Sequence, residues 1–191
     1  MRRQDAAPDG LPAPNRLAVV HRLDDAADRA LDMVRGHPVA DRLIYGLSET
    51  GNFSVLWHAL AWAPWLVSRS PARLRRAVGI SASLLLESVL VNGPIKAQFQ
   101  RDRPESDASR PHRLRQPRTS SFPSGHASAA MVASALLSRA QPRLRPLYYA
   151  TGVAMSASRV YVRLHHASDV AGGLAIGWGL GRVLSPLVRR R

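Results

Sequence analysis

The chain has 191 residues, enough for one domain with a sizeable core and too few for two ordinary domains. It carries 27 Lys and Arg against 13 Asp and Glu, an excess that implies an anionic partner such as nucleic acid, a membrane surface or a phosphorylated substrate. Nucleic acid is disfavoured, because aromatic residues make up only 6% of the chain and do not alternate with basic ones. The absence of cysteine excludes disulfides and thiolate metal sites.

The N-terminal region begins with residues 1–15, which are rich in Pro, Asp and Ala and are expected to form a disordered arm. They lack the apolar stretch of a signal peptide. From Leu17 to Arg35, apolar residues recur at helical spacing with charged residues on the opposite face, which predicts an amphipathic helix ending at Gly36. Such a helix fits either the surface of a soluble fold or a membrane interface.

Apolar segments dominate the rest of the chain, at about 53–68, 76–95, 124–138, 146–161 and 168–188. Arg-rich connections at 68–76 and 139–145 are typical of loops that flank membrane spans, although no segment is an uninterrupted run of about 20 apolar residues. Many small residues in the later segments suit close helix packing in lipid, and Glu87 is expected to face the bundle interior. We therefore expect an all-α, membrane-embedded bundle, with an N-terminal amphipathic helix and about five transmembrane helices forming a single domain over 16–191.

The first candidate motif is KAQFQRDRP at 96–104, which places Lys96 and Arg103 at the end of the second apolar segment. Alone, such cations more often anchor a helix at the membrane interface. A long polar loop follows, and loops of this length in compact domains are usually functional or disordered. Four arginines in the loop favour a substrate with more than one negative charge: Arg110, Arg113, Arg115 and Arg118.

The second motif is FPSGH at 122–126, at the start of the third apolar segment. Ser124 is a plausible helix N-cap, and Gly125 allows a bound group to approach the backbone closely. The free N–H groups of a helix N-terminus form an anion site, and His126 in the first turn would lie against the anion, placed for proton transfer. An incidental histidine at a capped helix start is the alternative.

The third motif is SRVYVRLHHASD at 158–169. If a helix begins near His165, then His165 and Asp169 share one helix face and can form a hydrogen bond. A carboxylate on one ring nitrogen raises the basicity of the other, which makes His165 a candidate nucleophile. His166 would lie on a different face and play no part. Taken alone, a His–Asp pair at this spacing is more often a surface contact.

The boundaries of the apolar segments bring the three motifs together. If segments two to five each cross the membrane once, the 96–124 loop and the 159–169 turn lie on the same side. Catalysis of phosphoryl transfer depends mainly on positioning and on electrostatic stabilisation, and a set of cations, histidines and a carboxylate supplies both. The cations of this set are Lys96, Arg103 and Arg159.

In order and spacing, these motifs resemble the signature of the type-2 phosphatidic acid phosphatase superfamily, which also contains the vanadium haloperoxidases. The signature reads Lys, six residues, Arg-Pro; then Pro-Ser-Gly-His; then Ser-Arg, five residues, His, three residues, Asp. No signature position departs from it: the chain has Lys96, Arg103-Pro104, Pro123-Ser124-Gly125-His126, Ser158-Arg159, His165 and Asp169.

The resemblance implies a role for each matching residue. His165 would attack phosphorus to form a phosphohistidine, Asp169 would hold its imidazole, and His126 would protonate the leaving oxygen and then help to activate water. The phosphate oxygens would be bound by Lys96, Arg103, Arg159, Ser124 and the backbone N–H of Gly125. The resemblance implies neither a metal nor a cofactor.

Among members of this superfamily, the short chain and the short Arg-rich loops favour an integral membrane lipid phosphatase. The expected substrate is a polyprenyl phosphate or diphosphate, phosphatidic acid or a similar lipid phosphate, with no nucleic acid partner. A soluble acid phosphatase, a vanadate-dependent haloperoxidase relative and a non-catalytic phosphate-binding membrane protein remain as alternatives. The positive-inside rule puts the connections at 68–76 and 139–145 in the cytoplasm, so a multi-pass protein in the cell membrane would have its active site on the extracytoplasmic side.

Overall fold

The computed structural model describes residues 16–105, 114 and 119–188; the arm at 1–15 and the four loop arginines lie outside these residues. The described part contains seven α-helices and no strand, which confirms the all-α class. They are α1 (Arg16–Asp32), α2 (Pro38–Thr50), α3 (Val55–Ser68), α4 (Pro71–Leu90), α5 (Gly125–Ala140), α6 (Arg145–Tyr161) and α7 (Ala167–Leu184).

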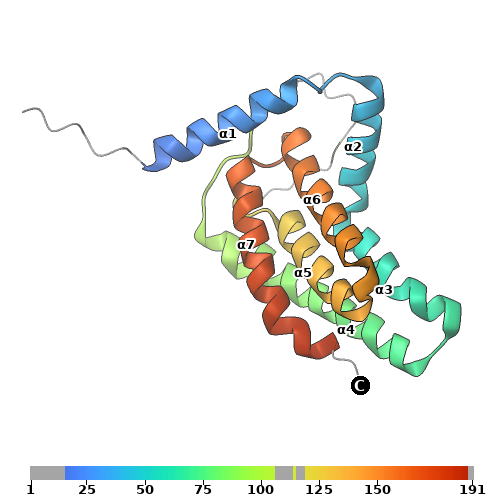
Figure 1. Cartoon of the computed structure of the whole chain (residues 1–191). Coiled ribbons are helices and arrows are strands. Elements are labelled where there is room, and N and C mark those ends of the chain that lie inside the picture. The colour runs from blue at the N-terminus through green and yellow to red at the C-terminus, as the bar shows by residue number, and fades with distance from the viewer. Residues whose placement is uncertain (1–15, 106–113, 115–118, 189–191) are drawn as a thin grey trace, which may run out of the picture.

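Helix α5 is the centre of the bundle and packs against α3, α4, α6 and α7 (Figure 1). Its Ala- and Ser-rich sequence permits close approach, and its buried side chains include Ala130, Val132 and Leu136. Glycines on α7 face it. A Cβ added at Gly177 would lie 2.4 Å from the carbonyl oxygen of Ser128, so the two backbones are in contact there. The expected role of small residues in helix packing is thus confirmed.

The sequence did not predict α2. His37 caps this helix by accepting a hydrogen bond from the backbone N–H of Ala40, and Pro38 occupies its first turn, where the missing N–H costs nothing. The chain therefore turns at Gly36, which has a left-handed φ of 86°, and resumes as a second helix. Pro38 is both the end signal of one helix and the start signal of the next.

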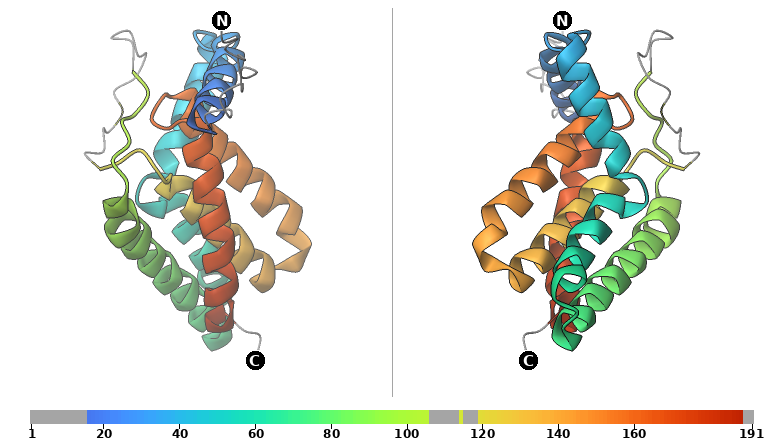
Figure 2. Two further views of the ribbon diagram at one scale, coloured as in Figure 1. Left: turned by 90° about the vertical axis from the view of Figure 1, so that its left-hand side faces the viewer. Right: turned by 90° about the vertical axis from the view of Figure 1, so that its right-hand side faces the viewer.

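Figure 2 shows that α1 and α2 lie at the end of the bundle opposite the C-terminus. The connection from α6 to α7 lies at the same end, and α1 packs against both of these helices. A π-helical turn (Val91–Ile95) and a 3-10 turn (Lys96–Gln98) extend α4 into the polar loop. The first motif therefore follows the end of α4, and the third motif lies at the connection between α6 and α7.

Two helical stretches of the described chain are long and apolar enough to cross a membrane: Pro71–Gln98, with 28 residues, and Ala167–Val188, with 22 residues. Large apolar side chains are exposed on their outer faces, among them Leu85, Val89, Trp178 and Val183. Extended apolar surface of this kind marks contact with a membrane or a partner. The expected number of about five transmembrane helices is not confirmed by these two stretches.

Candidate active site

The three motifs meet at a cavity of about 400 Å³ at the α1 end of the bundle. The end of α4, the start of α5, the end of α6 and the α6–α7 connection each contribute to its wall. The signature residues that line it are Lys96, Gly125, His126, Arg159 and His165. Residues separated by about 70 positions in sequence are thus placed around one space, which is large enough for a phosphate group and part of its leaving group.

His165 is buried at this cavity, with only 2% of its surface exposed. Nη1 of Arg103 lies 3.3 Å from Nε2 of the ring. A guanidinium can only donate, so Nε2 is the acceptor and the ring proton is on Nδ1, which faces Asp169. Burial lowers the pKa of His165 to about 4, Arg103 and Lys96 act in the same direction, and Asp169 opposes them. The ring is therefore neutral at pH 7.

The His165–Asp169 pair differs from the expected geometry. Helix α7 begins at Ala167, so His165 precedes the helix and does not share a helix face with Asp169. Nδ1 of His165 is 3.7 Å from Oδ2 of Asp169, longer than a hydrogen bond. The separation arises because Asp169 lies in the first turn of α7, where its carboxylate accepts the backbone N–H of His166 at 2.8 Å. His166, expected to play no part, contributes this backbone group.

Asp169 is completely buried and is held by two side chains that the sequence did not single out. Nη1 of Arg101 donates to Oδ1 at 2.6 Å, and the hydroxyl of Ser121 donates to Oδ2 at 2.5 Å. Arg101 lies within the first motif, two residues before Arg103, but nothing in its spacing indicates which carboxylate it pairs with. Only the three-dimensional structure identifies this contact.

His126 lies in the first turn of α5, as expected, with its Nε2 3.1 Å from the side-chain oxygen of Asn52. Ser124 is the N-cap: its hydroxyl accepts from the N–H of Ala127 at 3.5 Å, and its side chain is fully buried beneath the helix. The Ser124 hydroxyl therefore holds α5 and does not line the cavity, unlike Gly125. A Cβ at Gly125 would lie 2.6 Å from the side-chain oxygen of Asn92, so this position accepts only glycine without rearrangement.

Two cations of the cavity wall are themselves held in place. Nη1 of Arg159 donates to the carbonyl and the hydroxyl of Ser48 on α2, at 3.0 and 2.5 Å, while its buried Nε has no partner among the described residues. Nζ of Lys96 lies 3.5 Å from the hydroxyl of Thr119. Arg103, near the cavity, donates to the carbonyl of Leu164 at 2.6 Å. Because Lys96 and Arg159 both line the cavity, their positive charges would stabilise a phosphate bound there.

Glu87 lines the same cavity from α4 and is 1% exposed, which confirms that it faces the bundle interior. Its Oε1 has no hydrogen-bond partner in the described part of the chain. It is an acidic group in an otherwise basic cavity wall.

Comparison with known proteins agrees with the motifs. The family model of the PAP2 superfamily matches residues 76–191, and the chain belongs to this superfamily. It is 28% identical over 149 residues to decaprenylphosphoryl-5-phosphoribose phosphatase of Mycobacterium tuberculosis, in strains CDC 1551 / Oshkosh and H37Rv, covering 73% of this chain and 75% of the relative.

Two solved structures share the fold. One is the transmembrane PAP2 type phosphatidylglycerolphosphate phosphatase from Bacillus subtilis, with a TM-score of 0.61 and 24% identity, covering 88% of this chain and 85% of that one. The other is Aquifex aeolicus LpxE, with a TM-score of 0.60 and 20% identity, covering 88% and 93% of the two chains. The family match begins at Arg76, so α1, α2 and α3 lie outside it.

Proposed function

We propose that the protein is an integral membrane lipid phosphatase that hydrolyses a phosphate monoester or diphosphate of a lipid through a phosphohistidine at His165. The observation that carries this proposal is a buried, neutral His165 whose Nε2 is a hydrogen-bond acceptor, here for Arg103, at a cavity lined by Lys96 and Arg159. A neutral imidazole with donors around it is suited to attack a phosphoryl group whose charge those donors stabilise.

In the first step, Nε2 of His165 attacks phosphorus as the bond from phosphorus to the lipid oxygen breaks. The electron pair of that bond passes to the leaving oxygen, which takes a proton from His126 in its imidazolium form, so that His126 becomes neutral. Arg103, which donates to Nε2 in the free protein, must turn its Nη1 to a phosphate oxygen for the attack to occur. Asp169 stabilises the positive charge on the phosphorylated ring.

In the second step, water attacks phosphorus and gives a proton to His126. The bond between Nε2 and phosphorus breaks, its electron pair returns to Nε2, and inorganic phosphate leaves. The products are phosphate and the lipid alcohol from a monoester, or phosphate and the lipid monophosphate from a diphosphate, and both histidines regain their starting protonation.

A lipid substrate is supported by the named relatives and by the apolar outer faces of α4 and α7. Within the lipid phosphates we favour a polyprenyl carrier lipid, because the curated relative is a decaprenylphosphoryl-5-phosphoribose phosphatase.

The test is phosphate release by the purified protein in detergent, with polyprenyl phosphate, polyprenyl diphosphate, phosphatidic acid and phosphatidylglycerol phosphate as substrates and EDTA present throughout. We expect turnover with at least one lipid, and none from His165→Ala. Retained turnover in His165→Ala would exclude this nucleophile, and complete loss in EDTA would exclude a metal-free reaction. Phosphate binding with neither turnover nor labelling of a histidine would instead favour a non-catalytic binding protein.

The membrane arrangement that we propose has helices α3 to α7 as about five spans, with the active site on the extracytoplasmic side. The Arg-rich connections at the opposite end of the bundle support this orientation. Because the chain has no cysteine, a Ser109→Cys variant offers a single thiol on the catalytic-side loop, outside the described residues. Labelling of this thiol in intact cells by a membrane-impermeant maleimide supports the orientation; labelling only after lysis contradicts it.

A further inference from the structure

The N-terminal helix α1 reaches the catalytic centre from outside the region that matches the family. It crosses the end of the bundle above the start of α7 (Figure 1). Asp24, on its inner face, is 4% exposed. Its Oδ1 accepts the backbone N–H of Ser168 at 2.7 Å, and its Oδ2 accepts the Ser168 hydroxyl at 2.8 Å. Asp24 therefore caps the first turn of α7, one residue before Asp169.

Arg101 connects this carboxylate to the catalytic one. Its Nη2 donates to Oδ2 of Asp24 and its Nη1 to Oδ1 of Asp169, each at 2.6 Å. The guanidinium is planar, and its donors have fixed relative directions. A shift of Asp24 therefore moves Arg101, and with it the carboxylate of Asp169.

We infer that Asp24 and Arg101 are positioning residues for the reaction, acting through Asp169 on His165; the inference rests on the proposed function. The gap of 3.7 Å between Asp169 and Nδ1 of His165 makes the position of the carboxylate critical, because a movement of less than 1 Å separates a hydrogen bond from none. The Asp24–Arg101 pair holds Oδ1 of Asp169 and so helps to set how far Oδ2, which also accepts from Ser121 and His166, lies from the ring when the ring becomes positively charged.

The test compares Asp24→Asn with Asp25→Asn in the full-length protein. Asp25 is the next residue on α1 and is exposed, so its substitution removes the same charge without touching Arg101. We expect Asp24→Asn to lower kcat by about 10-fold with KM changed less than about 2-fold. Asp24 does not contact the substrate, so its loss should slow the attack by His165 and leave substrate binding nearly unchanged. We expect Asp25→Asn to match the wild type. Arg101→Gln should lose more activity than Asp24→Asn, and Arg101→Lys should recover part of the loss.

A double variant separates positioning from simple loosening of α1. If Asp24 acts through Arg101, Asp24→Asn combined with Arg101→Gln should be no slower than Arg101→Gln alone, and the rate of phosphohistidine formation in a single turnover should fall with kcat. Multiplied losses, or an Asp24→Asn variant as active as Asp25→Asn, would overturn the inference. An inactive wild type would instead contradict the proposed function, so the two failures are distinguishable.

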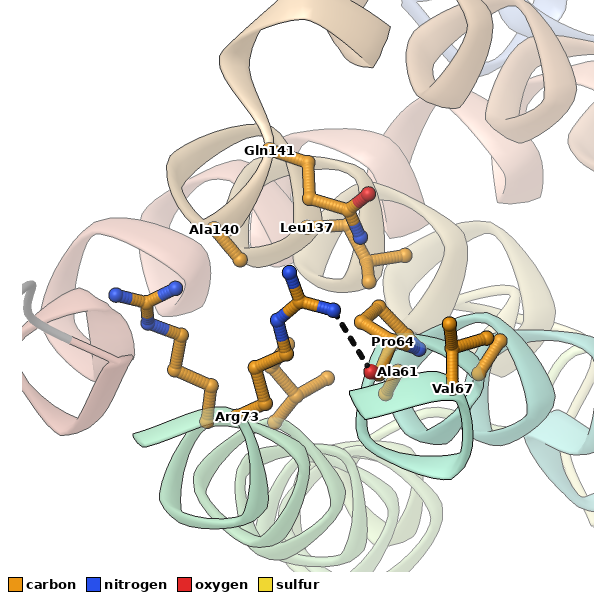
Figure 3. Close-up of a pocket in the computed structure, with 10 residues that line it drawn as sticks. Ala61, Pro64, Val67, Arg73, Leu137, Ala140 and Gln141 are labelled. Atoms are coloured by element: carbon orange, nitrogen blue, oxygen red, sulfur yellow. Dashed lines mark hydrogen bonds between the residues drawn. The ribbon is translucent and has the colours of Figure 1, made fainter. Parts of the chain in front are cut away.

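A second observation concerns a cavity of about 400 Å³ at the opposite end of the bundle, between the end of α3, the start of α4 and the end of α5 (Figure 3). Arg73 and Arg76 both line it, whereas none of its lining residues is acidic. Nη1 of Arg73 donates to the carbonyl of Pro64 at 3.1 Å, and Arg76 has no ion pair within the described chain. The remaining wall is mainly apolar and includes Ile80 and Leu137.

We propose that this cavity binds the phosphodiester headgroup of an anionic membrane lipid. Two guanidinium groups without a carboxylate favour an anion, and the apolar wall suits the attached acyl region. Helix α5 has its N-terminus at the catalytic cavity and its C-terminus here; its 16 residues separate the two by about 24 Å, so one lipid headgroup cannot occupy both.

The measurement is the shift in unfolding temperature of detergent-purified protein on adding phosphatidylglycerol, phosphatidylcholine or inorganic phosphate. Arg75 provides the control, because it is exposed on the same turn of α4 and does not line the cavity. We expect phosphatidylglycerol to stabilise the wild type and Arg75→Gln, and to have at most half that effect on Arg73→Gln and Arg76→Gln. Equal shifts in all four proteins, or a shift from inorganic phosphate as large as that from phosphatidylglycerol, would overturn the lipid site.

Discussion

Nη1 of Arg103 lies 3.3 Å from Nε2 of His165, so a permanent donor occupies the position from which the nucleophile must act. The contact fixes the neutral tautomer of the ring, with its proton on the side of Asp169. It also means that the free protein keeps its nucleophile covered by the same cation that would later stabilise phosphate.

The pKa of His165 offers a direct test of this state. Burial lowers that pKa to about 4, so the ring should remain neutral as the pH falls through 6.5 and should gain a proton only near pH 4. NMR of ¹³C-histidine-labelled protein measures this, with the His165 signal identified by its loss in His165→Ala. A midpoint near 6.5 would contradict the burial and cation contacts described for this ring.

His126→Ala should slow hydrolysis by about 10²–10⁴-fold, the usual contribution of a general acid or base. Because water activation is impaired along with leaving-group protonation, phosphohistidine should persist long enough to be trapped from a labelled substrate. Acid-labile, base-stable label on the protein checks this, with His165→Ala as the blank. Label that persists in His165→Ala would place the covalent intermediate elsewhere.

Arg159→Lys should reduce kcat/KM by roughly 10²-fold although the charge is kept. The guanidinium uses Nη1 to bond both the carbonyl and the hydroxyl of Ser48, which directs its other nitrogens, and a lysine ammonium cannot reproduce that arrangement. Steady-state kinetics on the preferred lipid measures the loss. Ser48→Ala, which removes only one of the two bonds, should have a smaller effect. An Arg159→Lys variant as active as the wild type would show that the fork geometry of Arg159 is unimportant.

The packing of α5 on α7 predicts opposite results at two glycines of α7. A Cβ at Gly177 would lie 2.4 Å from the backbone oxygen of Ser128, so Gly177→Ala should destabilise the protein by about 1–3 kcal/mol. Gly179 has no atom within 4 Å of the same added group, so Gly179→Ala should be neutral or stabilise by up to about 1 kcal/mol. Unfolding temperatures in detergent compare them, and equal values would contradict the described helix contact.

The sequence predicted the helices that carry an apolar pattern. Its three motifs also predicted charged and histidine side chains that the structure brings to one cavity, namely Lys96, His126, Arg159 and His165. It did not predict α2, because the proline that ends one pattern also starts the next helix. It did predict Ser124 as the N-cap of the helix that begins at Gly125, which is confirmed, but it could not tell that the capping hydroxyl would not line the cavity, because capping and phosphate binding favour the same residue type. The partners of Asp169 were missed for another reason: Arg101 and Ser121 reach it across 68 and 48 residues, and such contacts depend on tertiary packing.

The contact between α5 and α7 also bears on how substrate preference can change. The backbone N–H of Ser124 donates to the carbonyl of Asp169 at 2.9 Å, so the helix start that carries His126 is tied directly to the one that carries the catalytic carboxylate. The opposite wall, formed by α4 and by the connection Asn52–Ser54, meets the start of α5 through a side chain: the side-chain oxygen of Asn52 lies 3.1 Å from Nε2 of His126. Side chains of that wall can therefore be exchanged for a new lipid while the backbone link between the starts of α5 and α7 is kept.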